Sequence, residues 1–183
     1  NIPNLFTLGR IVMIPLFILI LCFGKSLTGH VVAAIVFALA SITDYLDGYL
    51  ARKWQVVTNF GKFADPLADK MLVMTAFIML VELKMVPAWI AAIIICRELA
   101  VTGLRLLLVE NGGTVLAAAM PGKVKTFTQM FSILFLFLND VFFAAVSIPI
   151  GEILLYICLF FTVYSGIDYF YHSKDIFSDS FGK

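Results

Sequence analysis

Six apolar stretches dominate the sequence, and each is long enough to cross a lipid bilayer as a helix. They lie near residues 5–24, 31–51, 66–83, 86–109, 124–145 and 149–171. A helix needs about 20 apolar residues to cross the ~30 Å of hydrocarbon. Hydrophobic residues make up 62% of the chain, against roughly 45 to 50% in soluble domains. We therefore predict an all-α integral membrane protein with six transmembrane helices and a single domain over residues 1–183.

Composition narrows the chemistry. The net charge of +1 gives no indication of nucleic-acid binding. The two histidines are far apart in sequence, which argues against a multi-histidine zinc site or a Ser-His-Asp triad. Each of the three cysteines lies in an apolar stretch, where we expect it to pack as a small hydrophobic residue. The first stretch lacks a small-residue cleavage site, so we expect it to remain as a helix rather than be removed as a signal peptide.

The basic residues predict the orientation of the helices. If the six stretches alternate in direction, Lys25 and Lys84 fall on one side and the other eleven basic residues fall on or toward the opposite side. Loops rich in Lys and Arg stay in the cytoplasm. We therefore expect both termini to be cytoplasmic.

Four aspartates interrupt the apolar sequence between Ser41 and Lys70, namely Asp44, Asp47, Asp65 and Asp69. One ionised side chain at the bilayer centre costs roughly 2.5 to 3.5 kcal/mol, and four close together would also repel one another. A divalent metal ion would relieve the repulsion, because hard dications prefer oxygen ligands. The alternative is that these residues are helix caps and surface charges of a cytoplasmic loop.

Helical spacing groups the aspartates in pairs. At about 100° per residue, Asp44 and Asp47 share a helix face with Gly48 and Ala51, whose small side chains leave room for a ligand. Asp65 and Asp69 are one turn apart. Because proline suits the first position of a helix, the residues Asp65 and Pro66 predict that the third helix begins there, with Asp65 as its cap.

The pattern DxxDGxxAR, followed after eight residues by GxxxDxxxD, resembles the motif of the CDP-alcohol phosphotransferase family. This resemblance implies a six-helix enzyme, a homodimer, and two divalent ions, Mg²⁺ or Mn²⁺, that hold the diphosphate of a CDP-linked lipid. It also implies that Asp69 is both a metal ligand and the general base. The remaining matched positions would be metal ligands (Asp44, Asp47, Asp65), space for the cytidine nucleotide (Gly48, Ala51, Gly61) and a phosphate contact (Arg52).

A polar stripe and four cations extend the expected site. Asn4, Thr7 and Arg10 recur every third residue and point a stripe toward the cavity, where contact with the diphosphate is one reading and contact with lipid headgroups another. Arg97, Arg105, Lys123 and Lys125 favour an anionic acceptor, because a phosphate needs such partners. Alternatively, the lysines bind headgroups and Arg97 pairs with an acid such as Asp168.

The segments NIPNLFTLGR, GKFADPLADK, RELAVTGLR and GKVKT are similar to the bacterial branch of that family whose acceptor is sn-glycerol 3-phosphate. The similarity implies transfer of a phosphatidyl group from CDP-diacylglycerol, in the cytoplasmic membrane and with the site facing the cytoplasm. Inositol phosphate or phosphatidylglycerol are alternative acceptors. A divalent-cation transporter is an alternative of another class, although the segment VVAAIVFALASIT before Asp44 offers ions little polar path.

Overall fold

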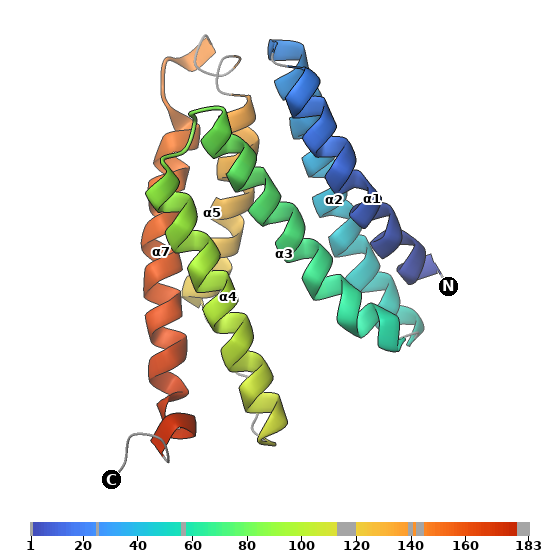
Figure 1. The fold of residues 1–183 in the computed structure, drawn as a ribbon, viewed down its shortest axis with the longest axis vertical. Coiled ribbons are helices and arrows are strands. Elements are labelled where there is room, and N and C mark those ends of the chain that lie inside the picture. The colour runs from blue at the N-terminus through green and yellow to red at the C-terminus, as the bar shows by residue number, and fades with distance from the viewer. Residues whose placement is uncertain are drawn as a thin grey trace. The chain divides into compact units, whose positions relative to one another are not determined.

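The computed structural model describes residues 2–24, 26–55, 58–112, 120–138, 141 and 145–178. In these ranges the regular structure is helical and no strand occurs (Figure 1). The elements are α1 (Ile2–Phe23), α2 (Leu27–Trp54), α3 (Asn59–Glu82), α4 (Ala88–Glu110), α5 (Met120–Phe137), α7 (Ile150–His172) and the short 3₁₀ helix η1 (Lys174–Phe177).

The predicted start of the third helix was wrong. Helix α3 begins at Asn59, and Thr58 is its N-cap, because its hydroxyl accepts a hydrogen bond from the backbone N–H of Gly61. Pro66 therefore lies inside the helix, where its ring removes one backbone donor. The break before α3 is correspondingly short, since α2 ends at Trp54 and its C-cap Gln55 adopts the left-handed conformation.

The predicted fifth stretch also ends too late, because α5 stops at Phe137 rather than near residue 145. Helical backbone returns at residue 141 and at residues 145–146. The other positions between 139 and 144 lie outside the described residues.

The chain divides into two compact units, and α5 contributes to both. The first unit comprises residues 1–86 and 133–151. In it, α1 packs against both α2 and α3. Phe17 of α1 is fully buried, and its ring lies 6.4 Å from Phe37 of α2 and 5.6 Å from Phe137 of α5. Aromatic and small residues thus make the core that holds α1 beside α2 and α3.

The second unit comprises residues 87–132 and 152–183. Its small apolar cluster joins α4 to α7 through Val101, Leu104 and Tyr169. Beside this cluster the interior is polar, because the following side chains are buried in the helices of this unit: Glu98, Lys125, Thr128, Gln129, Ser132, Thr162 and Ser165. A buried polar interior needs internal partners, and these are described below.

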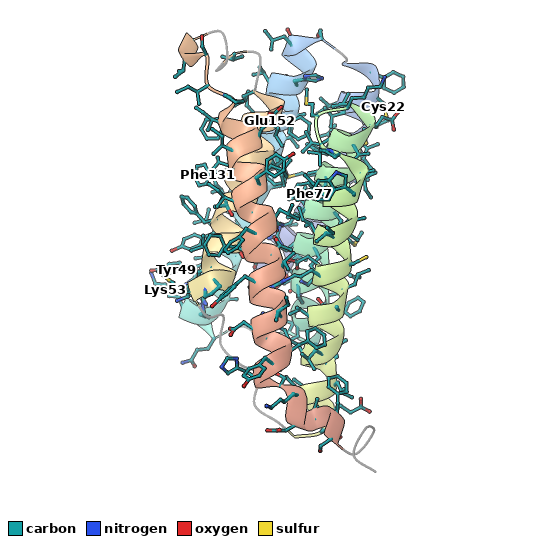
Figure 2. All side chains as sticks on the ribbon, turned by 90° about the vertical axis from the view of Figure 1, so that its left-hand side faces the viewer. Cys22, Tyr49, Lys53, Phe77, Phe131 and Glu152 are labelled. Atoms are coloured by element: carbon teal, nitrogen blue, oxygen red, sulfur yellow. The ribbon has the colours of Figure 1, made fainter. Side chains whose placement is uncertain are left out.

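Three helices of the described ranges are long and apolar enough to cross a membrane, and these are Asn4–Phe23, Leu27–Trp54 and Ile150–His172. Their outer faces carry exposed apolar side chains such as Val12 and Ile167, which suits contact with lipid. Figure 2 shows Tyr49 and Lys53 beside each other at the C-terminal end of α2, where the lysine ammonium lies 5.9 Å from the ring centre. Three helices meet the prediction of six spans. Helices α3 and α4 carry charged residues along their length, and α5 carries two lysines near its start.

Candidate functional site: a carboxylate cluster and a set of buried cations

Helix α1 supplies a buried cation to the aspartates of α2. Arg10 is 0% exposed, and its guanidinium forms an ion pair with Asp44 at 2.8 Å and a longer one with Asp47 at 3.6 Å. Both aspartates therefore face the same neighbour, as their spacing along α2 predicted. The two pairs differ in surroundings, because the Asp44 side chain is 39% exposed and that of Asp47 only 2%.

Thr7 connects the acids of α2 with those of α3. Its hydroxyl lies 2.9 Å from Asp47 Oδ2 and within hydrogen-bonding contact of Asp65 Oδ1. Because one hydroxyl reaches both carboxylates, Asp47 and Asp65 lie close together although they belong to different helices. Asp69 follows Asp65 by one turn and, like Asp65, is near enough to Asp44 to repel its charge. The structure therefore gathers all four aspartates at one end of the first unit.

Asn4 is tied to the start of α3 rather than to a carboxylate. Its Oδ1 accepts a hydrogen bond of 2.9 Å from the hydroxyl of Thr58, the cap of α3. Gly61 lies beside this contact, since a Cβ placed there would come within 3.3 Å of both Asn4 Oδ1 and Thr58 Oγ1 and within 3.6 Å of Asp65. A larger residue at position 61 would displace these polar atoms. The polar stripe of α1 thus contacts Asp44 and Asp47 of the first part of the motif and Asp65 of the second.

The space expected beside Gly48 is present. Among the described residues, and leaving aside the backbone of its own helix, a Cβ built on Gly48 would meet one atom within 4 Å, a guanidinium nitrogen of Arg52 at 3.9 Å. Ala51 is partly buried on the same helix and adds no bulky side chain. The end of α2 therefore combines open space with one nearby cation, an arrangement that can receive an anionic group.

The acid cluster has the right donors for a divalent ion but does not yet form a metal site. In the part of the chain that the structure describes, no group of three or more His, Cys, Asp or Glu side chains is placed to hold one ion. Arg10 and Thr7 instead contact Asp44 Oδ1, Asp47 Oδ2 and Asp65 Oδ1. One observation favours a cation beyond Arg10, because Asp47 Oδ1 is buried and has no hydrogen-bond partner among the described residues. Oxygen donors of this kind suit Mg²⁺ or Mn²⁺, provided that Arg10 releases the carboxylates.

The four expected acceptor-site cations belong to the second unit and differ in burial. Lys125 is 6% exposed and binds Glu98 of α4. Arg97 forms an ion pair with the same Glu98 oxygen at 3.2 Å, and its other terminal nitrogen donates to Ser165 of α7 at 3.0 Å. Lys123 is exposed. Arg97 therefore pairs with an acid on its own helix and not with Asp168, whose carboxylate instead lies 3.2 Å from Nδ1 of His172.

Arg105 is held by an aromatic ring. Its guanidinium carbon lies 5.5 Å from the centre of the Tyr169 ring, within the range of a cation–π contact. The Nε atoms of Arg97 and Arg105 are both buried without a hydrogen-bond partner among the described residues. A buried donor left unpaired costs roughly 1 to 3 kcal/mol, so both nitrogens would gain from an anionic ligand.

Sequence reasoning missed several members of these networks, chiefly Thr58, Glu98, Ser165 and Tyr169. Glu98 carried a usable sign in the sequence, because a carboxylate in the middle of an apolar helix needs a partner for the same reason as the aspartates do. Thr58 fits the ordinary preference for threonine before a helix. Nothing in the sequence pattern marked Ser165 or Tyr169, since their contacts depend on how α7 packs against α4.

Comparison with known proteins gives consistent results. The profile of the CDP-alcohol phosphatidyltransferase family matches residues 1–164. A Bacillus subtilis protein named CDP-diacylglycerol--glycerol-3-phosphate 3-phosphatidyltransferase is 48% identical over 181 residues, covering 93% of each chain. Proteins of the same name from Rickettsia felis and Haemophilus influenzae are 42% and 36% identical, and each match covers at least 97% of both chains. The chain, with its motif of four aspartates, belongs to the CDP-alcohol phosphatidyltransferase family.

Proposed function

We propose that this chain transfers a phosphatidyl group from CDP-diacylglycerol to sn-glycerol 3-phosphate, giving phosphatidylglycerol phosphate and CMP. The observation that carries this conclusion is the 48% identity, over nearly the whole length, to a protein with this named activity. The eight motif residues agree with it, and so do the cations of the second unit, of which Lys125 is buried and Arg97 and Arg105 are half-buried. A transporter is disfavoured, because relatives that match nearly the whole chain are named as transferases.

In the proposed reaction, the acceptor hydroxyl attacks the phosphorus next to diacylglycerol. The new P–O bond forms as the bond to CMP breaks, and the hydroxyl proton passes to the carboxylate of Asp69. Two divalent ions held by the four aspartates would supply charge neutralisation at the diphosphate. Asp69 is suited to the proton transfer because it lies at the edge of the cluster, one turn beyond Asp65.

The remaining motif residues receive binding roles. Gly48 and Ala51 leave space for the cytidine nucleotide, and Arg52 contacts phosphate beside Gly48. Gly61, also expected to make space for the nucleotide, instead lets Asn4, Thr58 and Asp65 approach one another closely. Thr7 orients α1 against the carboxylates, and Asn4 orients it against the start of α3. A divalent ion held by Asp44 and Asp47 would replace their ion pairs with Arg10, and the guanidinium of Arg10 would then be available to the diphosphate.

For the acceptor phosphate we propose Arg97, Arg105 and Lys125, with Lys123 adding charge from an exposed position. The two unpaired Nε–H donors support this assignment, because a phosphate oxygen would satisfy them. The excess of basic residues on one side of the predicted helices supports cytoplasmic termini and a site that opens to the cytoplasm. A homodimer in a bacterial cytoplasmic membrane completes the proposal.

The function is tested by CMP release from CDP-diacylglycerol. Purified protein would receive glycerol 3-phosphate, inositol phosphate or phosphatidylglycerol in separate reactions, each with Mg²⁺ or with a chelator. Of the three acceptors, we expect only glycerol 3-phosphate to give CMP release. The chelator should abolish this release, and addition of Mg²⁺ or Mn²⁺ should restore it. If CMP were released only with one of the other two compounds, that compound would be the acceptor instead of glycerol 3-phosphate. No release, together with divalent-ion flux into vesicles, would favour the transporter.

The acceptor site is tested by Arg97→Ala and Lys125→Ala. Each change is expected to raise the KM for glycerol 3-phosphate by roughly 10- to 100-fold, because a hydrogen bond to a charged group contributes roughly 1.5 to 3 kcal/mol. The KM for CDP-diacylglycerol should stay nearly constant. Lys174→Ala serves as the control, since it removes an exposed charge of the same unit. Equal rises in both KM values would argue against this assignment.

A further inference from the structure

Glu98 is a buried carboxylate at the centre of the cation set. It is 7% exposed, and its Oε1 contacts both Arg97 and Lys125. Arg97 is the residue before it on α4, whereas Lys125 comes from α5, so one oxygen joins cations of two helices. Such an arrangement fixes the two cations relative to each other, because a shared charge-assisted contact restricts both long side chains.

The charges of this group explain why an acid is present. Arg105 is near enough to Arg97 to repel it, and Lys125 and Arg97 also repel each other. Three cations in a poorly solvated interior would be unfavourable without an anion. Glu98 reduces the sum to two positive charges. A phosphomonoester carries about two negative charges at neutral pH, so its charge matches the group that includes Glu98.

The contacts of Arg97 indicate which of its nitrogens could bind a phosphate. Glu98 accepts from one terminal nitrogen at 3.2 Å, and Ser165 accepts from the other at 3.0 Å. The third nitrogen, Nε, is buried without a hydrogen-bond partner among the described residues. At Gly166 of α7, a Cβ would lie 3.1 Å from Arg97 Cγ, so the glycine lets the arginine stem pack closely. Arg97 is thus held on two sides, and among the described residues its Nε–H is left as an unpartnered donor.

We propose that Glu98 is a positioning residue that holds Lys125 and Arg97 in place for the phosphate of the acceptor and balances their charge to suit a phosphomonoester. The inference rests on the acceptor site proposed above. Glu98 itself does not touch the acceptor. It acts through the two cations, which is why its loss should alter acceptor binding rather than the chemical step.

The test compares Glu98→Gln with Glu98→Asp in the full-length protein. Glutamine keeps the size but loses the charge, so the KM for glycerol 3-phosphate should rise about tenfold while kcat and the KM for CDP-diacylglycerol change less than about twofold. Aspartate keeps the charge and should restore part of the loss. Glu110→Gln is the matched control, because Glu110 is exposed at the end of the same helix.

A double variant covers the case in which Glu98→Gln folds poorly. Glu98→Gln combined with Lys125→Gln removes one charge of each sign, and its KM for glycerol 3-phosphate should be little higher than that of Lys125→Gln alone. Additive effects, or equal rises in both KM values, would overturn the positioning role. The outcomes separate the two proposals. If Arg97→Ala and Lys125→Ala leave the acceptor KM unchanged, the acceptor site is wrong; if they raise it and Glu98→Gln does not, only the role of Glu98 is wrong.

Discussion

Replacing Asp69 by asparagine is expected to lower the rate of CMP release roughly 10²- to 10⁴-fold, the usual contribution of a general base. Asparagine has nearly the same shape but cannot accept the proton of the acceptor hydroxyl. The other three aspartates and the space beside Gly48 remain. Binding of CDP-diacylglycerol should therefore be largely retained, and it can be measured directly with the purified variant.

Glu82→Gln is the appropriate control for Asp69→Asn. Glu82 is exposed at the far end of the same helix α3, so the substitution changes charge in the same way without touching the cluster. Turnover of the Asp69 variant at the normal rate would remove this residue as the base. If the variant lost both turnover and binding of CDP-diacylglycerol, the main role of Asp69 would instead be to hold metal.

Replacing Arg10 by methionine is expected to destabilise the protein by about 3 kcal/mol in the presence of chelator. Breaking a buried ion pair by removing one partner typically costs about 3 to 5 kcal/mol. The lower value applies because the pair with Asp47 is buried, whereas Asp44 is partly exposed and screened by solvent. The free energy of unfolding can be measured in detergent with increasing denaturant.

Addition of Mg²⁺ or Mn²⁺ should restore much of that loss and should stabilise Arg10→Met more than the unchanged protein. In the unchanged protein the ion must first displace Arg10 from Asp44 and Asp47, so part of its binding free energy is offset. Lys62→Met removes an exposed cation of α3 and provides the control. Equal stabilisation by metal in both proteins would contradict the competition between Arg10 and metal.

Most helices could be predicted from the sequence because their apolar length and spacing are local properties. The start of α3 could not, because two starts were compatible with local preferences. Pro66 with Asp65 fits a first turn, and so does Thr58 before Asn59. In the structure Thr58 caps the helix and is bound by Asn4 of α1. The start of α3 at Asn59 thus goes with a contact between Asn4 and Thr58, which are 54 positions apart in the sequence.

The candidate site was predictable to a similar extent. The aspartates were identifiable because charge is expensive in apolar sequence, and helical spacing placed them in pairs. Their partners were not, since no sequence pattern predicted that Arg10 of α1 forms ion pairs with Asp44 and Asp47. Likewise, the importance of Glu98 becomes visible only when α4 and α5 bring it against Lys125.

The sequence by itself determined that this chain is helical and rich in membrane-compatible segments, and that its acids form a family-specific motif. These properties follow from hydrophobicity, residue spacing and residue identity, which need no knowledge of neighbours. Only the tertiary structure decided which cation neutralises which acid, because several arginines and lysines were equally available along the chain. Packing selected Arg10 for the aspartates of α2, and Arg97 and Lys125 for Glu98, since a buried charge is stabilised only by a partner that the fold brings within a few ångströms.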